Sequence, residues 1–156
     1  MRGTIVCGVT DSEAGRGALA AAADLSRRLG LRLVLVHVAD GIAPLGVDGD
    51  TESVTICADR EGAARLVACM AADHGVADSA DQRSAIGDPA VLLGQIAAEE
   101  AADMIVVGSH ERGRLRRVVA SRFARQLATE TPVPVLIAPP QKRRARNGAA
   151  SPRGRR

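Results

Sequence analysis

The sequence predicts an α/β protein with a five-stranded parallel sheet and helices on both faces, a Rossmann-like arrangement. Short apolar runs alternate with longer segments of helical periodicity across the first 140 residues. Hydrophobic residues make up 46% of the 156-residue chain, which is enough for one core. With one Phe and no Trp or Tyr, that core must be aliphatic.

The first half of the chain predicts two strands, each followed by a helix. Residues 4–9 (TIVCGV) form an apolar run that ends at the turn signal TDSE, as a buried parallel strand does. Asp11 or Ser12 can cap a helix over residues 13–29, which Gly30 stops. Residues 31–38 are the second strand, and a helix over 53–74 ends at Gly75. The expected inner faces are Leu19, Ala22, Ala23, Ser26 and Leu29 on the first helix, and Ala63, Leu66, Val67, Met70 and Ala71 on the second.

The second half continues the alternation. Residues 76–87 are polar, so their place in the alternation makes them a strand, and an edge position would tolerate them. Asp88 and Pro89 are a typical N-cap and first residue of a helix. Residues 104–108 contain no polar side chain and should form a central strand. A helix follows over residues 115–129, and prolines place the last strand, within 132–140, at an edge. The expected inner faces are Leu92, Leu93, Ile96 and Ala97 on the third helix, and Leu115, Val119, Phe123 and Leu127 on the fourth.

Charge is unevenly distributed, which divides the chain into a domain over residues 1–140 and a tail over 141–156. The tail has seven basic residues and no acidic one, which leaves 14 basic against 18 acidic residues in the domain. We expect the tail to be disordered, and it could contact nucleic acid weakly and without sequence preference. The near absence of aromatic residues weighs against a single-strand module that stacks bases on aromatic rings.

The remaining composition indicates a cytoplasmic protein. Cys7, Cys57 and Cys69 show no pairing or zinc-ligand spacing, so we expect buried small residues in a reducing compartment. No apolar run approaches the roughly 20 residues that cross a membrane. The N-terminal residues lack the hydrophobic region of a signal peptide.

A ligand site is expected beyond the carboxyl ends of the strands, where the strand order reverses. The loops GVTDSE, HVAD and GSHERGR qualify. At the third, Gly108 and Gly113 would let an anion approach backbone N–H groups at a helix start. An ordinary helix-entry turn with solvated arginines accounts for this pattern equally well.

The whole sequence resembles the universal stress protein family. The resemblance rests on IVCGVTDSEAGRGALAAAADLSRRLGLRLVLVHV, on GDPAVLLGQIAAEEAADMIVVGSHERG and on ATETPVPVLIAPP, in this order and at these spacings. It implies the family's adenine-nucleotide-binding (adenine nucleotide alpha hydrolase-like) sheet. It also implies a homodimer paired through the last strand, with Val133, Val135 and Ile137 at the interface.

The nucleotide-binding motif of the family is only partly present. Binding members carry G-x2-G-x9-G-[ST] after the fourth strand, and here only the first position, Gly108, matches. The other three positions hold Glu111, Ser121 and Arg122, and Thr10 stands where binders have an aspartate. Glu111 would repel a triphosphate by about 1 to 4 kcal/mol.

The arginines near this loop support two opposite interpretations. Arg122 could grip phosphate in a bidentate manner, or could neutralise Glu111 together with its neighbours. A solvated helix face explains the same arginines without any ligand. His110 lies where family binders often contact phosphate.

Two functions remain open. The first is a dimeric stress-response or regulatory module with a degenerate loop and weak or no ATP binding. The alternative is a member that binds ATP with Mg, AMP or a cyclic nucleotide in a variant pocket. We expect no metal site and no enzyme beyond at most a slow ATPase, since no catalytic triad or paired carboxylates occur. The candidate nucleotide-binding residues are Gly8, Val9, Thr10, Val38, Val107, Gly108, His110, Glu111, Gly113, Ser121, Arg122 and Phe123.

Overall fold

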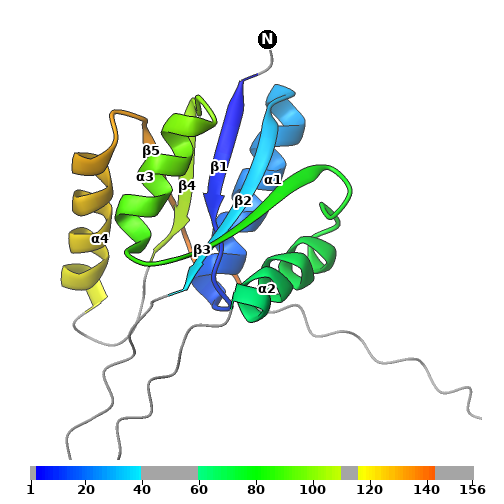
Figure 1. The fold of residues 1–156 in the computed structure, drawn as a ribbon, viewed down its shortest axis with the longest axis horizontal. Coiled ribbons are helices and arrows are strands. Elements are labelled where there is room, and N and C mark those ends of the chain that lie inside the picture. The colour runs from blue at the N-terminus through cyan, green and yellow to red at the C-terminus, as the bar shows by residue number, and fades with distance from the viewer. Residues whose placement is uncertain (1–2, 40–59, 110–115, 143–156) are drawn as a thin grey trace, which may run out of the picture.

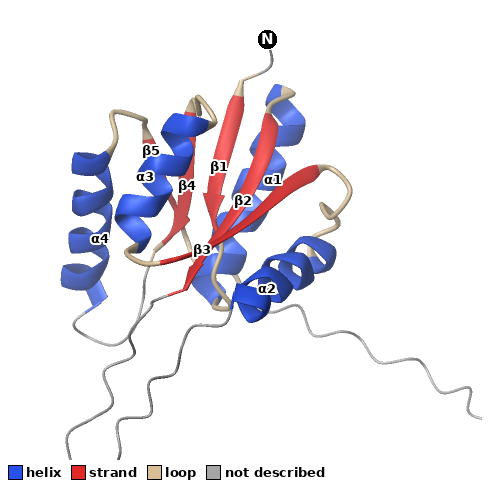
Figure 2. Cartoon of the chain, in the orientation of Figure 1, coloured by secondary structure: helices blue, strands red, loops and turns tan. Residues whose placement is uncertain are grey.

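The computed structural model describes residues 3–39, 60–109 and 116–142, which form a five-stranded parallel sheet between two layers of helices (Figures 1 and 2). The strand order β3-β2-β1-β4-β5 places the reversal between β1 and β4. The predicted fold class is therefore confirmed, as are both edge strands. The strands are β1 (Thr4–Gly8), β2 (Arg32–Ala39), β3 (Ala80–Ile86), β4 (Met104–Gly108) and β5 (Val135–Ala138). The helices are α1 (Glu13–Leu29), α2 (Arg60–Asp73), α3 (Pro89–Glu99) and α4 (Arg116–Glu130).

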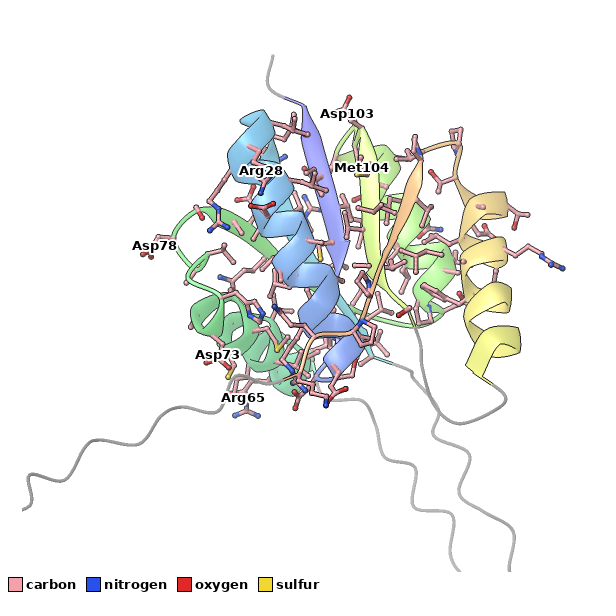
Figure 3. The ribbon with its side chains drawn as sticks, turned by 180° about the vertical axis from the view of Figure 1, so that it is seen from behind. Arg28, Arg65, Asp73, Asp78, Asp103 and Met104 are labelled. Atoms are coloured by element: carbon pink, nitrogen blue, oxygen red, sulfur yellow. The ribbon has the colours of Figure 1, made fainter. Side chains whose placement is uncertain are left out.

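Each face of the sheet has its own aliphatic core. α3 lies in front of the sheet in Figure 1, and α1 lies in front when the molecule is seen from behind in Figure 3. Alternate strand residues point to opposite faces, so Ile5 and Cys7 join the core under α1 and α2, while Val6 joins the core under α3 and α4. The central strands are covered on both faces, as their unbroken apolar sequence requires.

Local signals define both ends of α1. Ser12, one of the two predicted caps, accepts a hydrogen bond from Gly15 N at 3.0 Å. Asp11, the other candidate, forms an ion pair with Arg16 at 3.0 Å instead. Gly30 ends the helix with a φ of 67°, the left-handed conformation that glycine adopts without steric cost.

Two burial predictions on the helices are wrong. Leu29 is 58% exposed, because the chain turns at Gly30 and Leu25 and Leu31 pack against the core in its place. Cys69 is exposed, because the buried stripe of α2 runs along the other side of that helix. Cys7 is buried as expected, and Cys57 lies outside the described residues, as do residues 53–59 of the predicted second helix.

Ion pairs hold the polar edge strand β3 at the end of the sheet away from the reversal loops. Arg32 on β2 contacts Asp81 at 2.6 Å and Glu100 at 2.5 Å, and Arg83 on β3 pairs with Glu99 at 3.3 Å and with Glu100. Glu100 and then Asp81 raise the pKa of the Arg32 guanidinium. Charge pairing therefore supplies contacts that the sequence of β3 cannot make through apolar side chains.

The amino ends of the central strands are tied together at the same end of the sheet. Asp103, labelled in Figure 3, accepts a hydrogen bond from Thr4 N at 2.7 Å. At the far edge, β5 pairs with β4 and carries two exposed apolar side chains, Leu136 (38%) and Ile137 (47%). None of the described helices is both long and apolar enough to cross a membrane.

Candidate functional site

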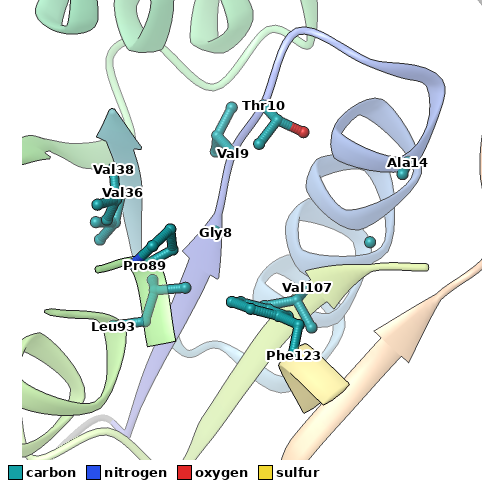
Figure 4. A pocket seen from close by; sticks show the side chains of 11 residues that line it. Gly8, Val9, Thr10, Ala14, Val36, Val38, Pro89, Leu93, Val107 and Phe123 are labelled. Carbon is teal, nitrogen blue, oxygen red and sulfur yellow. The ribbon is translucent and has the colours of Figure 1, made fainter. Parts of the chain in front are cut away.

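A pocket of about 310 Å³ opens at the carboxyl ends of β1 and β4, at the predicted reversal of strand order (Figure 4). This volume lies at the lower end of the range for small-molecule sites. Its lining residues are Gly8, Val9, Thr10, Ala14, Val36, Val38, Pro89, Leu93, Val107, Gly108 and Phe123. Thr10 is the one residue among them with a polar side chain, so the pocket is almost entirely apolar.

The N-terminal turn of α3 forms one wall. Asp88 caps this helix by accepting hydrogen bonds from Ala90 N at 2.9 Å and Val91 N at 3.1 Å. Those bonds, led by that from Val91, lower the pKa of the Asp88 carboxyl, and Gln126 adds to the effect. The cap fixes the first turn of α3, from which Pro89 and Leu93 reach the pocket.

The start of α1 forms a second wall, and glycines bring it close to the sheet. A Cβ at residue 108 would overlap the carbonyl group of Ala14 and lie 2.8 Å from Ala14 Cβ. Thr10 Oγ1 and Ser12 Oγ lie 2.8 Å apart, which connects the β1 loop to the helix cap. The glycine at 108 is therefore required by packing alone, whether or not an anion binds nearby.

The backbone of β2 supplies polar groups at the edge of the pocket. Val9 N donates to Val36 O at 2.8 Å, the last backbone hydrogen bond between the β1 segment and β2 among the residues described. Because peptide groups alternate along a parallel ladder, the N–H and C=O of Val38 face the same side as those of Val36. His37 Nδ1 donates to Val9 O at 2.7 Å and holds this part of the rim in place.

The structure brings together many of the predicted site residues. Those lining the pocket are Gly8, Val9, Thr10, Val38, Val107, Gly108 and Phe123. His110, Glu111 and Gly113 lie outside the described residues, and so do the side chains of Ser121 and Arg122.

Four lining residues were not predicted: Ala14, Val36, Pro89 and Leu93. Val36 could have been found, since it precedes Val38 by two residues on the same strand face. The α3 residues carry no such signal, because only the tertiary fold brings that helix to the strand ends.

Side chains that could bind a metal do not cluster in the part of the chain described. No group of three or more His, Cys, Asp or Glu side chains there could hold a metal ion. The arrangement suits binding of a mostly apolar, flat group with polar contacts from the backbone.

Comparison with known proteins identifies the family. The sequence profile of the universal stress protein family matches residues 1–139. The chain therefore belongs to the universal stress protein family. No curated protein matches the sequence.

Solved structures of this family share the fold. A universal stress protein from Burkholderia pseudomallei is 27% identical with a TM-score of 0.63, over 87% of this chain and 95% of that one. A universal stress protein solved in complex with cAMP is 20% identical with a TM-score of 0.60, over 87% and 96% of the two chains. The Archaeoglobus fulgidus protein in complex with dAMP is 18% identical with a TM-score of 0.56, over 88% and 98%.

Proposed function

We propose that this chain is a regulatory binding protein that holds an adenine mononucleotide, AMP or a cyclic nucleotide, in the pocket and binds ATP weakly. The observation that carries the proposal is the preformed apolar pocket at the reversal of strand order, bordered by the Val38 peptide groups. Ligands of open α/β sheets bind at this position. The complexes of two family members with cAMP and dAMP support the same ligand class.

The pocket suits the base of a nucleotide better than its phosphates. Val36, Val38, Leu93 and Val107 offer apolar contact to a flat ring. The N–H and C=O of Val38, side by side, complement the acceptor and donor along the edge of adenine. Among the described residues no cationic side chain lines the pocket, which favours a position of the phosphates outside it, toward the loop after β4.

The sequence of that loop disfavours three phosphates. Glu111 adds a negative charge, and Ser121 and Arg122 replace the small residues that leave room for a triphosphate in binding members. Like-charge repulsion of about 1.4 kcal/mol would weaken ATP tenfold. A ligand with one phosphate carries less charge to repel, so AMP and cAMP should be less affected than ATP.

The same site supports binding rather than catalysis. Thr10 Oγ1 is engaged with Ser12, and no histidine or carboxylate among the described residues lines the pocket to activate it. We infer that the regulatory activity of the chain depends on whether the pocket holds a ligand.

Equilibrium dialysis tests the proposal directly. The chain has no Trp or Tyr, so ultraviolet absorbance of the protein fraction reports bound nucleobase almost without background. We expect AMP and cAMP to bind more tightly than ATP with Mg²⁺. Submicromolar ATP binding would overturn the preference, and absence of binding by all three would overturn the proposal.

A double substitution tests the role of the loop. Glu111→Gly with Ser121→Gly should raise ATP affinity about tenfold while changing AMP affinity little. If ATP affinity stays the same, steric and charge exclusion by these two residues is refuted. Ser79→Gly is a suitable control, because Ser79 lies in the turn before β3 and is not part of the pocket lining.

We also propose that the protein is a homodimer paired through β5. Ile137 and Leu136 are exposed, and an unpaired apolar edge strand favours pairing with a second copy. Val133 and Val135, also expected at the interface, are half-buried and pack against the core of their own chain.

Light scattering tests the assembly. It should give about 32 kDa, twice the 16.1 kDa of one chain, and Ile137→Lys should halve that mass. Leu29→Lys, at an exposed leucine on α1, should leave it unchanged. A wild-type mass of one chain would refute the dimer. Residues 143–156 of the basic tail lie outside the described residues, and contact of the tail with nucleic acid stays a separate prediction.

A further inference from the structure

The single aromatic residue of the chain lies at the pocket. Phe123, on α4, is half-buried and packs against the core beneath α3 and α4. Figure 4 shows its side chain reaching into the pocket beside Val107. The rest of the described lining is aliphatic apart from Thr10 and the glycines, so among the described residues this ring is the one π surface available to a ligand there.

Contacts further along α4 hold the ring in this position. Leu127, one turn after Phe123, is fully buried. Gln126 Nε2 donates to both carboxylate oxygens of Asp88, at 3.3 Å and 3.2 Å. Asp88 is the cap of α3, so this contact joins the two helices that supply Phe123 and the Pro89–Leu93 wall. The ring and the aliphatic wall are thus fixed relative to each other before a ligand arrives.

We propose that Phe123 stacks on the base of the bound nucleotide and gives the pocket a preference for purines over pyrimidines. This inference rests on the proposed function, which requires a nucleotide in the pocket. Sugar and phosphate need polar partners that this part of the lining lacks, so the base is the portion that fits against the ring. Stacking grows with the size of the base, and purines have the larger face.

The scarcity of aromatic residues does not conflict with this role. Binding a nucleic-acid strand by stacking needs a series of rings, which the composition excludes. Holding one base needs one ring at the right place, and the chain places its only phenylalanine there.

Two substitutions of Phe123 test the proposal, with binding measured by equilibrium dialysis against AMP and UMP. Phe123→Leu keeps an apolar side chain but removes the π face. We expect AMP affinity to fall roughly tenfold and the AMP-to-UMP affinity ratio to fall with it. A merely structural role would weaken both nucleotides equally and leave the ratio unchanged.

Phe123→Trp gives a direct optical readout, because it introduces the only Trp of the chain. Saturating AMP should quench its fluorescence, whereas ribose 5-phosphate should not. Leu29→Trp is the matched control, since Leu29 is 58% exposed at the far end of α1 and its emission should not respond to AMP.

The outcomes separate the two proposals. If wild type binds AMP but Phe123→Leu keeps the wild-type ratio and Phe123→Trp shows no quenching, stacking is refuted and the proposed function stands. If wild type binds no adenine nucleotide, both fall together. A lower AMP-to-UMP affinity ratio in Phe123→Leu, together with quenching of the Trp fluorescence in Phe123→Trp, supports the inference. Thermal unfolding must show that both variants are folded.

Discussion

Substituting Gly108 by alanine separates two explanations for the one position of the nucleotide motif that this chain retains. A phosphate-binding role predicts a folded protein that has lost affinity. The structure instead predicts a loss of stability, because the added methyl group would overlap the carbonyl of Ala14 and lie 2.8 Å from Ala14 Cβ. Carbon atoms pack at about 3.5 to 4 Å, so α1 and β4 would have to separate by roughly 0.7 Å or more.

The expected cost follows from this overlap. Forcing one methyl group into a packed interior costs typically 1 to 3 kcal/mol, and contact with rigid backbone places Gly108→Ala near about 3 kcal/mol. For a domain of this size, 1 kcal/mol corresponds to about 3 °C in the melting temperature. We therefore expect a decrease of about 9 °C, measured by far-ultraviolet circular dichroism without ligand.

Gly75→Ala is the matched control, because it makes the same chemical change in open space. Gly75 has a φ of 67° and no atom within 4 Å of the added Cβ, so only backbone strain of about 1 kcal/mol applies. Equal melting temperatures for the two variants would refute the packing explanation of Gly108. The glycine would then have to be explained by its ligand.

Two further predictions concern titratable groups. Asp88→Ala should cost about 1 kcal/mol at neutral pH through loss of the α3 cap. In the folded protein the pKa of Asp88 is lowered, so the stability advantage of wild type over Asp88→Ala is complete above the unfolded pKa of about 3.9 and shrinks as pH falls through the folded pKa. Chemical unfolding of both proteins across acidic pH measures this stability difference. A difference that grows as pH falls would contradict the prediction. Burial raises the pKa of the Cys7 thiol to about 12, whereas Cys69 is exposed. In a Cys57→Ser background a thiol reagent should therefore modify one cysteine of the native protein and two after unfolding, and rapid modification of Cys7 in the native state would count against its burial.

The fold was predictable because each element carries a local signal of its own. An apolar run such as residues 104–108 identifies a central strand, and Asp88 followed by Pro89 identifies a helix start. The polar sequence of β3 was correctly assigned to an edge. What holds β3 there was not predictable, since the Arg32–Asp81 pair joins residues that are 49 positions apart.

The candidate site was predictable in part, for a similar reason. Strand ends can be located from sequence, so Val9 and Val38 were found. The wall supplied by Leu93 depends on where α3 docks, which no local pattern encodes. Leu29 shows the opposite error, because it was predicted to be buried and is exposed. Its helical spacing matches the buried face, but the chain reverses direction directly after it.

The way the chain leaves β5 affects how the basic residues can be removed for experiment. Gln141 N donates to Glu13 O at 2.7 Å, and a Cβ at Gly17 would overlap the carbonyl of Pro139, so this segment is seated against the first turns of α1. A shortened protein that stops at Pro140 would lose this anchor next to Ala14, along with the positive charge. Truncation after Gln141 keeps the anchor, so any change it produces can be assigned to removal of residues 142–156 and not to loss of the anchor.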